Sequence, residues 1–404
     1  MSDDEATELV MRLMAIPGRS GEEAAVLAAV EEQLRAAGVP DGAIARDDAH
    51  RRSAFRSDAG EPGGVGNLIV KLPGSAGGPR RMLSAHADTV PICVGCEPLR
   101  EGEQIVSANP ATGLGADDRA GCAVVLSTAL ELLRSGTPHP PLTLLWTVQE
   151  EVGLHGARNV DMAELGGGPD DLPRLAFNFD GGSPAKVTVG ATGGYRMAVE
   201  VIGVASHAGN HPERGVSAIA VASIAIADLH RGGWLGLIEK RGLIEKEVRR
   251  GASNVGVIQG GAATNVVTDR VTLRAEARSH DADFREEIVA EIEASFRSAA
   301  AAVTNTAGET GRVEFDGRLD YESFRLADDD PSRTAAIAAI EAEGGAPVCE
   351  VTNGGIDANW LSARGVPTVT LGCGQRNIHT VGERLDLAEF HLARRLALRL
   401  ATGA

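Results

Sequence analysis

Histidine and acidic residues lie at the ends of four short apolar runs that are far apart in the chain. The runs span residues 80–86, 141–148, 172–179 and 366–372, and their composition is typical of buried β-strands. The residues at or just past their ends are His86 and Asp88, Glu150 and Glu151, Asp180, and His379. In open α/β sheets ligands bind beyond the carboxyl ends of the strands, so we expect these groups to meet at one edge of a sheet.

Two of the glutamates are adjacent, in the stretch "LLWTVQEEVG". Neighbouring side chains of an extended chain point to opposite sides, so Glu150 and Glu151 are predicted to have different surroundings and different roles. Asp117 and Asp118 stand at the start of a predicted helix over 118–136. We interpret Asp118 as a helix-start carboxylate that is favoured by the helix dipole rather than as a ligand.

The chemistry expected of this set is metal binding. Gathering so many carboxylates without a cation would raise their pKa values through mutual repulsion, whereas two divalent metals would compensate the charge. Imidazole and carboxylate ligands without thiolates suit zinc, cobalt or manganese, and the two imidazoles, His86 and His379, favour zinc.

The elements that must position these groups predict an α/β fold with two domains. Strands alternate with helices in a pattern that indicates a mixed, largely parallel sheet covered by helices on both faces. Between 191 and 321 the order changes to β-α-β-β-α-β, which is typical of a ferredoxin-like unit. We therefore expect a catalytic domain over 1–190 and 322–404, with a second domain inserted at 191–321.

Two local patterns carry further expectations. Ser20 and Glu23 are spaced as a capping box, with Ser20 as the N-cap of a helix within 17–38. The pentapeptide "GLIEK" occurs at 236–240 and again at 242–246, and is interpreted as a charged surface helix or a lengthened linker.

Composition excludes several classes of protein. A formal net charge of -17 and an aromatic content of 3% argue against nucleic-acid binding and against anionic membrane surfaces. No apolar stretch reaches the length of a membrane span, and the acidic N-terminus lacks the features of a signal peptide. Five cysteines do not form a disulfide framework, and Cys93 and Cys96 are interpreted as structural or incidental thiols, so a cytoplasmic location is expected.

Six motifs in order along the chain resemble the M20 family of co-catalytic zinc metallopeptidases. They are "SAHADTVP", "LGADDRAGCA", "TVQEEVGLHGA", "NFDGG", "ASHAGNHPERGVSAI" and "NIHTVGE". The stretches "GADDRAG", "GGIDAN" and "AEARS" are closest to the peptidase T-like branch of that family. The similarity extends from about residue 16 to residue 383 and includes the inserted domain.

The resemblance implies a role for each residue of the proposed centre. His86 and Asp180 would bind one zinc, Glu151 and His379 would bind the other, and Asp117 would bridge both. Asp88 would orient the imidazole of His86, and Glu150 would carry the proton from the attacking water to the leaving amine.

The resemblance also implies residues of the inserted domain, which acts as a lid. In dimeric members of the family a lid histidine, which matches His207 here, reaches into a neighbouring subunit and stabilises the oxyanion. A homodimer formed through the lid is therefore one arrangement that the resemblance implies. Asn265 and Arg278 match lid positions that contact the substrate, and Asn353 and Asp357 are expected to line the site. Arg278 as a plain surface charge and Asp357 as a turn former remain open.

Three functions remain open from the sequence. The resemblance implies a dinuclear zinc exopeptidase acting on short peptides, either an aminopeptidase or a tripeptidase. An N-acyl amino acid amidohydrolase or deacylase would use the same metal site with a different pocket. A non-catalytic peptide- or small-molecule-binding protein would be indicated by loss of Glu150 or of a ligand, and every ligand position is filled. Arg119, where many relatives carry lysine, keeps the charge but not the geometry.

Overall fold

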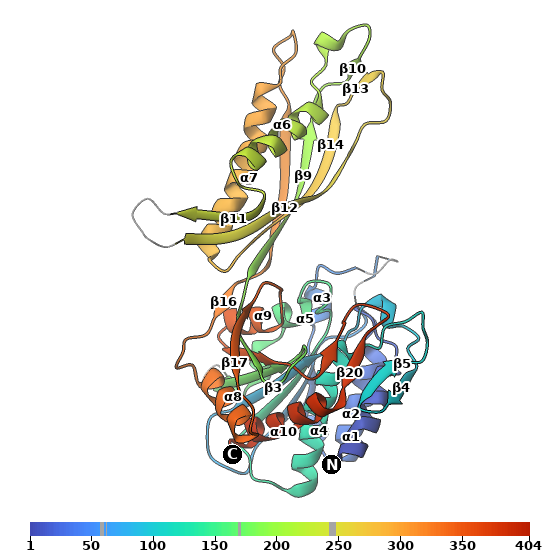
Figure 1. Cartoon of the computed structure of the whole chain (residues 1–404), viewed down its shortest axis with the longest axis vertical. Coiled ribbons are helices and arrows are strands. Elements are labelled where there is room, and N and C mark those ends of the chain that lie inside the picture. The colour runs from blue at the N-terminus through green and yellow to red at the C-terminus, as the bar shows by residue number, and fades with distance from the viewer. Residues whose placement is uncertain (57–59, 62, 169–170, 242–247) are drawn as a thin grey trace. The chain divides into compact units, whose positions relative to one another are not determined.

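The structure of the protein is a computed structural model that describes residues 1–56, 60–61, 63–168, 171–241 and 248–404. The chain forms two compact units, each with its own core (Figure 1). Unit 1 comprises Met1–Ala191 and Arg325–Ala404, and unit 2 comprises Thr192–Phe324.

Unit 1 is built on a mixed sheet. In chain order its strands are β1 (Ile44–Arg46), β2 (Leu68–Leu72), β3 (Arg81–His86), β6 (Leu142–Thr147), β7 (Leu175–Phe179), β8 (Lys186–Ala191), β16 (Phe324–Arg325), β17 (Val348–Thr352) and β18 (Thr368–Leu371). Their spatial order is β1-β2-β6-β3-β7-β18-β8-β16, with β17 paired to β8. The central neighbours β6, β3, β7 and β18 run parallel, while β2 and β8 run antiparallel to them.

Helices cover both faces of this sheet, as the sequence predicts. They are α1 (Asp3–Met14), α2 (Ala24–Ala36), α3 (Ala49–Arg52), α4 (Ala116–Ser135), α5 (His155–Asn159), α8 (Pro331–Ala342), α9 (Ala358–Ala363) and α10 (Leu387–Thr402). Neighbouring residues of β6 show the alternation: Leu145 packs with Ala157 and Leu361 on one face, and the Trp146 indole donates to the Cys122 carbonyl on the other. Burial on both faces explains why the central strands are continuously apolar.

A small antiparallel sheet flanks the large one in unit 1. Its strands are β4 (Pro98–Glu101), β5 (Gln104–Ser107), β19 (Gln375–Arg376) and β20 (Arg384–Asp386), in the order β19-β20-β5-β4. It brackets the loop that carries His379, which therefore has both ends anchored.

Unit 2 contains the predicted β-α-β-β-α-β order with additions. Its elements are β9 (Gly193–Ile202), β10 (Ser206–His207), α6 (Ala218–Arg231), β11 (Gly236–Arg241), β12 (Val248–Gly260), β13 (Val266–Val267), β14 (Arg270–Ser279), α7 (Ala282–Ala302) and β15 (Arg312–Tyr321). The sheet has the order β11-β12-β14-β9-β15. Alternate residues of β9, namely Met197, Val199 and Val201, are buried in the core formed with the two helices.

Two local predictions were wrong. Helix α2 begins at Ala24, and Ser20 and Glu23 do not form a capping box, because neither side chain bonds to the helix and both bond to other segments. The first "GLIEK" copy forms strand β11 rather than a helix or linker, because it pairs with β12. The second copy lies outside the described residues.

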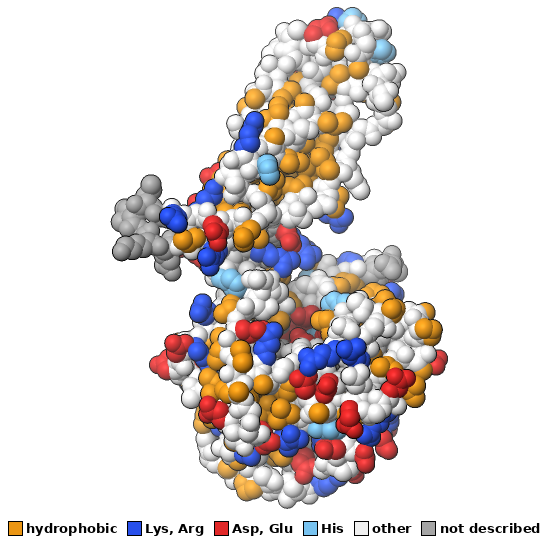
Figure 2. Space-filling view, in the orientation of Figure 1, with side chains coloured by type: hydrophobic (Ala, Val, Ile, Leu, Met, Phe, Trp, Pro, Cys, Tyr) orange, Lys and Arg blue, Asp and Glu red, His pale blue; other side chains and the backbone are white. Residues whose placement is uncertain are grey.

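Two observations bear on the class of protein. Among the described residues, no helix combines the length and apolar character that crossing a bilayer requires. Figure 2 shows acidic and basic side chains interspersed over the visible face of unit 1, so the excess of acidic residues is not gathered there in one patch.

Candidate metal centre

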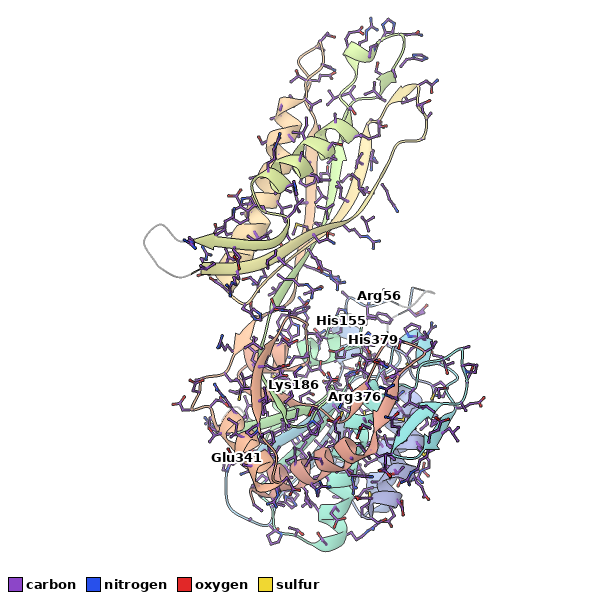
Figure 3. All side chains as sticks on the ribbon, viewed as in Figure 1. Arg56, His155, Lys186, Glu341, Arg376 and His379 are labelled. Atoms are coloured by element: carbon purple, nitrogen blue, oxygen red, sulfur yellow. The ribbon has the colours of Figure 1, made fainter. Side chains whose placement is uncertain are left out.

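The parallel strands of unit 1 end beside a cavity of about 360 Å³. The predicted residues that line it are His86, Asp117, Glu150, Glu151, Asp180 and His379. Figure 3 shows His379 and Lys186 on the same side of unit 1, and both line the cavity. The cavity therefore brings together residues that are nearly 300 positions apart, since His379 follows His86 by 293.

His86 ends β3, and its two ring nitrogens face two different aspartates. Its Nε2 lies 3.0 Å from Asp117 Oδ1, while its Nδ1 lies 3.1 Å from the Asp88 carbonyl oxygen and 3.4 Å from Asp88 Oδ1. Burial alone would lower the pKa of His86, but its contacts with Asp117 and Asp88 raise the pKa well above the ordinary value. Asp88 thus holds the ring so that Nε2 points at Asp117.

Asp117 also faces His379. His379 Nε2 lies 3.2 Å from Asp117 Oδ2 and 2.9 Å from Glu151 Oε1, and these two partners raise the pKa of His379 to about 10. Burial would raise the pKa of Asp117, but the two histidines bring it below its ordinary value. One oxygen of Asp117 therefore faces each imidazole, as a bridging carboxylate would.

Glu150 and Glu151 both line the cavity. Strand β6 ends at Thr147, and Gln149 has a left-handed backbone with φ of 57°, so the pair is not in an extended chain. Their surroundings still differ. Glu151 contacts His379, whereas no described residue donates a hydrogen bond to the Glu150 carboxylate.

The backbone of the two glutamates rests on one buried carboxylate. The Glu150 amide donates to Asp88 Oδ1 at 3.0 Å, and the Glu151 amide donates to Asp88 Oδ2 at 3.2 Å. Ser20 Oγ donates to the same Oδ2 at 2.6 Å. Burial raises the pKa values of both Glu150 and Glu151, so each carboxylate needs nearby positive charge in order to ionise.

Asp180 follows β7 on the same rim. Burial, reinforced by the charge of Asp117, raises the pKa of Asp180 to about 7. Ligand atoms of His86, Asp118 and Asp180 lie within 4.8 Å of one another, and the same holds for His86, Asp117 and Glu151.

Asp118 is buried, and its carboxylate is occupied by hydrogen bonds. It accepts from the Gly121 amide at 2.9 Å, as a carboxylate at a helix start does, and also from the His86 amide at 3.1 Å and Gln375 Nε2 at 2.8 Å. These bonds join the start of α4 to the end of β3, so Asp118 supports the residues on either side of it.

Glu383 is a functional residue that the sequence analysis did not single out. Its carboxylate, 2% exposed, accepts from the amides of Leu114 at 2.8 Å, Gly115 at 2.7 Å and Asp117 at 3.0 Å. It therefore ties the loop that carries Asp117 to the loop that carries His379. The only sequence signal was its place at the end of "NIHTVGE", because nothing local shows which amides a glutamate will meet.

Strained backbone is concentrated around the cavity. Among the described residues, the non-glycine residues with positive φ are Gln149, Leu154, Asn377 and His379. They fall in the two segments that carry Glu150, Glu151 and His379. Such conformations persist only where the surroundings enforce them, and they cluster at functional sites.

The residues of the "TNGGIDAN" stretch lie close to the cavity. Asp357 is 1% exposed, accepts a hydrogen bond from Thr147 Oγ1 and is not itself in the cavity lining, so its contact with a substrate stays a prediction. It is close enough for its charge to raise the pKa of Glu150. Asn353 lies between Thr352 and Gly354, both of which line the cavity, but it is not itself in the lining.

The predicted lid residues are all in unit 2. His207 is exposed, and its Nδ1 accepts from the amides of Gly209 at 3.2 Å and Asn210 at 3.0 Å. The Asn265 carbonyl accepts from the Ala208 amide at 2.9 Å, and Arg278 pairs with Glu276 at 3.1 Å. The ring of His207 is thus fixed as the tautomer that carries its proton on Nε2.

The donor atoms in the cavity fit metal cations. With Nδ1 of His86 donating to Asp88, its Nε2 presents a lone pair to the Asp117 carboxylate. Two acceptors at this distance are stabilised only by a shared proton or a cation. Imidazole and carboxylate donors without thiolate suit zinc, cobalt and manganese, so these residues would hold two such ions about Asp117.

Comparison with known proteins agrees with this geometry. Residues 82–402 match the model of the peptidase family M20/M25/M40. The uncharacterized protein YqjE of Bacillus subtilis (strain 168) is 32% identical over 327 residues, which are 81% of this chain and 81% of that protein.

Two solved structures are similar over almost the whole chain. Aminopeptidase PepT from Bacillus cereus ATCC 10987 has a TM-score of 0.83 at 29% identity, covering 99% of this chain and 98% of that one. A tripeptidase from Staphylococcus aureus subsp. aureus Mu50 has a TM-score of 0.84 at 26% identity, with the same coverage of 99% and 98%.

We predict that Glu383→Gln destabilises the metal-free protein by about 1–3 kcal/mol, because an amide group would face backbone N–H groups that now share a carboxylate. Urea unfolding measures this change in free energy. Glu101→Gln, at an exposed position of β4, is the matched control and should change it by less than about 0.5 kcal/mol. Equal values for the two variants would contradict the prediction.

Proposed function

The chain belongs to the peptidase family M20/M25/M40, hydrolases that act on peptide bonds, and on that premise we propose that it is a co-catalytic dinuclear zinc aminopeptidase of short peptides. The similarity to aminopeptidase PepT and to a tripeptidase supports this substrate class. The site lies among residues of unit 1 that belong to the matched region.

One observation carries the proposal. Glu150 lines the same cavity as the metal-binding candidates, its amide is held by Asp88, and no described residue is recorded as donating a hydrogen bond to its carboxylate. A carboxylate that is positioned by its backbone and uncommitted at its side chain can take up and release a proton. A purely binding site has no need of such a group.

The proposed ligands divide about Asp117. His86 and Asp180 would hold one ion, Glu151 and His379 would hold the other, and Asp117, which faces both imidazoles, would serve both. When bound, the two cations supply positive charge that polarises the substrate carbonyl and acidifies water. Glu150 accepts the proton of the attacking water at its carboxylate and delivers it to the leaving amine, while Asp88 keeps His86 in the required tautomer.

Substrates with one end chemically blocked test whether the enzyme requires a free amino terminus or a free carboxyl terminus. We expect turnover of free tripeptides and of C-amidated tripeptides, and at least tenfold slower turnover of N-acetylated tripeptides and N-acetyl amino acids. The measurement is kcat/KM by amine release on a common panel, with the zinc-loaded enzyme. Preference for N-acetyl amino acids would replace the aminopeptidase proposal with the amidohydrolase alternative.

The division of roles between the adjacent glutamates gives a mutational prediction. Glu150→Gln should lower kcat by about 10²- to 10⁴-fold while leaving the bound metal near two equivalents, because only the proton carrier is lost. Glu151→Gln should lower both activity and metal content, because a charged ligand becomes a neutral amide. Metal content is measured by elemental analysis after dialysis against a fixed zinc concentration.

Glu341→Gln, at an exposed position near the end of α8, serves as the control for the loss of a glutamate charge. It should match the parent protein in both measurements. A Glu150→Gln variant with near-normal kcat would refute the assignment of the proton carrier.

For the lid we propose that His207 donates a hydrogen bond to the oxyanion from the neighbouring subunit of a homodimer. Its support is the tautomer set by Gly209 and Asn210, which places a proton on the outer nitrogen, Nε2. Asn265 and Arg278 remain the proposed substrate contacts of the lid, and Asn353 the proposed contact beside the cavity.

A complementation experiment tests the exchange between subunits. Glu150→Gln and His207→Ala, each inactive alone, should regain about one quarter of the parent activity when co-expressed, because half of the dimers are mixed and each has one intact site. Recovery requires a dimer and a histidine that acts on the neighbouring subunit. No recovery, or a monomeric mass with full activity, would refute this arrangement.

A further inference from the structure

The segment between α1 and α2 is tied to the rim of the cavity by several hydrogen bonds. The buried Arg119 guanidinium donates to the carbonyls of Ile16 and Gly18, each at 3.3 Å, and also to the carbonyl of Ala87. The Thr89 amide donates to the Gly18 carbonyl at 3.1 Å. These bonds place the segment between α1 and α2 beside the loop that follows His86. Residues of this segment are therefore close enough to affect the geometry of the site.

Glu23 in this segment has a side chain that serves no purpose in its own helix. It occupies the N-cap position of α2 but makes no side-chain capping bond. It is fully buried, one oxygen accepts from the amides of Gly21 at 2.7 Å and Gln149 at 3.0 Å, and the other has no hydrogen-bond partner among the described residues. Burying a carboxyl with one unpartnered oxygen is costly, which favours a role for Glu23 other than stability.

The bond from Gln149 gives that role. Gln149 has a left-handed backbone, which costs a non-glycine residue of order 1 kcal/mol or more and persists only when its surroundings enforce it. The amides of Gln149, Glu150 and Glu151 then donate in succession, the first to Glu23 and the next two to Asp88. Three consecutive amides directed at two carboxylates form an anion-binding concavity, which sets the direction of the following side chains.

We propose that Glu23 is a positioning residue, which holds Gln149 in its left-handed conformation and thereby directs the Glu150 and Glu151 carboxylates into the cavity. It acts through the backbone and touches neither substrate nor metal. The inference rests on the proposed metal site, and it adds a residue outside the 82–402 region that matches the family.

The state of the Glu23 carboxyl suggests the substitution that should be tolerated. Burial, reinforced by the charge of Asp88, raises the pKa of Glu23 to about 8. A neutral side chain is therefore the appropriate replacement near neutral pH. Glutamine has the same reach and keeps a carbonyl oxygen for the amides of Gln149 and Gly21. Aspartate keeps the acid but is one methylene too short to reach Gln149.

The test compares Glu23→Gln and Glu23→Asp in the full chain by Co²⁺ affinity and by kcat and KM on a tripeptide. We expect the Co²⁺ affinity and kcat of Glu23→Gln to stay within about threefold of the parent values. For Glu23→Asp we expect both quantities to fall about 10- to 100-fold, while its KM stays within about twofold of the parent value. Glu22→Gln, at the adjacent partly exposed glutamate that pairs with Arg19, is the matched control and should equal the parent.

A second variant separates positioning from packing. Glycine adopts positive φ without strain. Adding Gln149→Gly to the Glu23→Asp variant should therefore raise its Co²⁺ affinity at least about threefold above that of Glu23→Asp alone. A packing defect at Glu23 would not respond to a change at residue 149.

The proposal is overturned if Glu23→Asp equals the control, if Glu23→Gln is as impaired as Glu23→Asp, or if Gln149→Gly restores nothing. The Co²⁺ affinities decide it even if no peptide is hydrolysed. A protein that binds two Co²⁺ with this pattern but cleaves no peptide would refute the proposed function alone.

Discussion

The carboxylate of Asp88 is the group on which the rest of the site depends. It is fully buried, yet it accepts hydrogen bonds from Ser20 and from the amides of Glu150 and Glu151, and it faces the ring of His86. One side chain therefore sets the tautomer of a proposed ligand and the backbone of both glutamates. Asp88 follows β3 by two residues, and from there its carboxylate reaches the amides of the segment that follows β6.

The acidic groups of the cavity have unusual pKa values, because most of them are buried. Burial raises the pKa values of Glu150, Glu151 and Asp180, while contacts with histidines lower that of Asp117. The three groups with raised pKa values would ionise less readily without nearby positive charge. Divalent cations would favour their ionised forms, since a cation stabilises the carboxylates around it.

The sequence identified the residues at the strand ends but not the contacts between loops. Strand ends converge by a general rule of α/β sheets, which brings His86, Asp180 and His379 together without knowledge of detailed geometry. The Ser20 and Glu23 pair satisfied a local helix-capping rule and was misassigned, because its partners, Asp88 and Gln149, are distant in sequence. The sequence also did not reveal that the chain leaves the extended conformation at Gln149, because no local signal marked this residue as left-handed.

Carboxylates recur as backbone anchors on this rim, and the reason is their capacity to accept several hydrogen bonds. Asp88, Asp118 and Glu383 each accept from two or more backbone amides, at least one of which lies in a segment distant in the sequence. An amide side chain, with one acceptor oxygen, does this less well. The consequence is that anchors and ligands carry the same charge and repel one another. Cations held by the proposed ligands would also reduce this repulsion at the anchors.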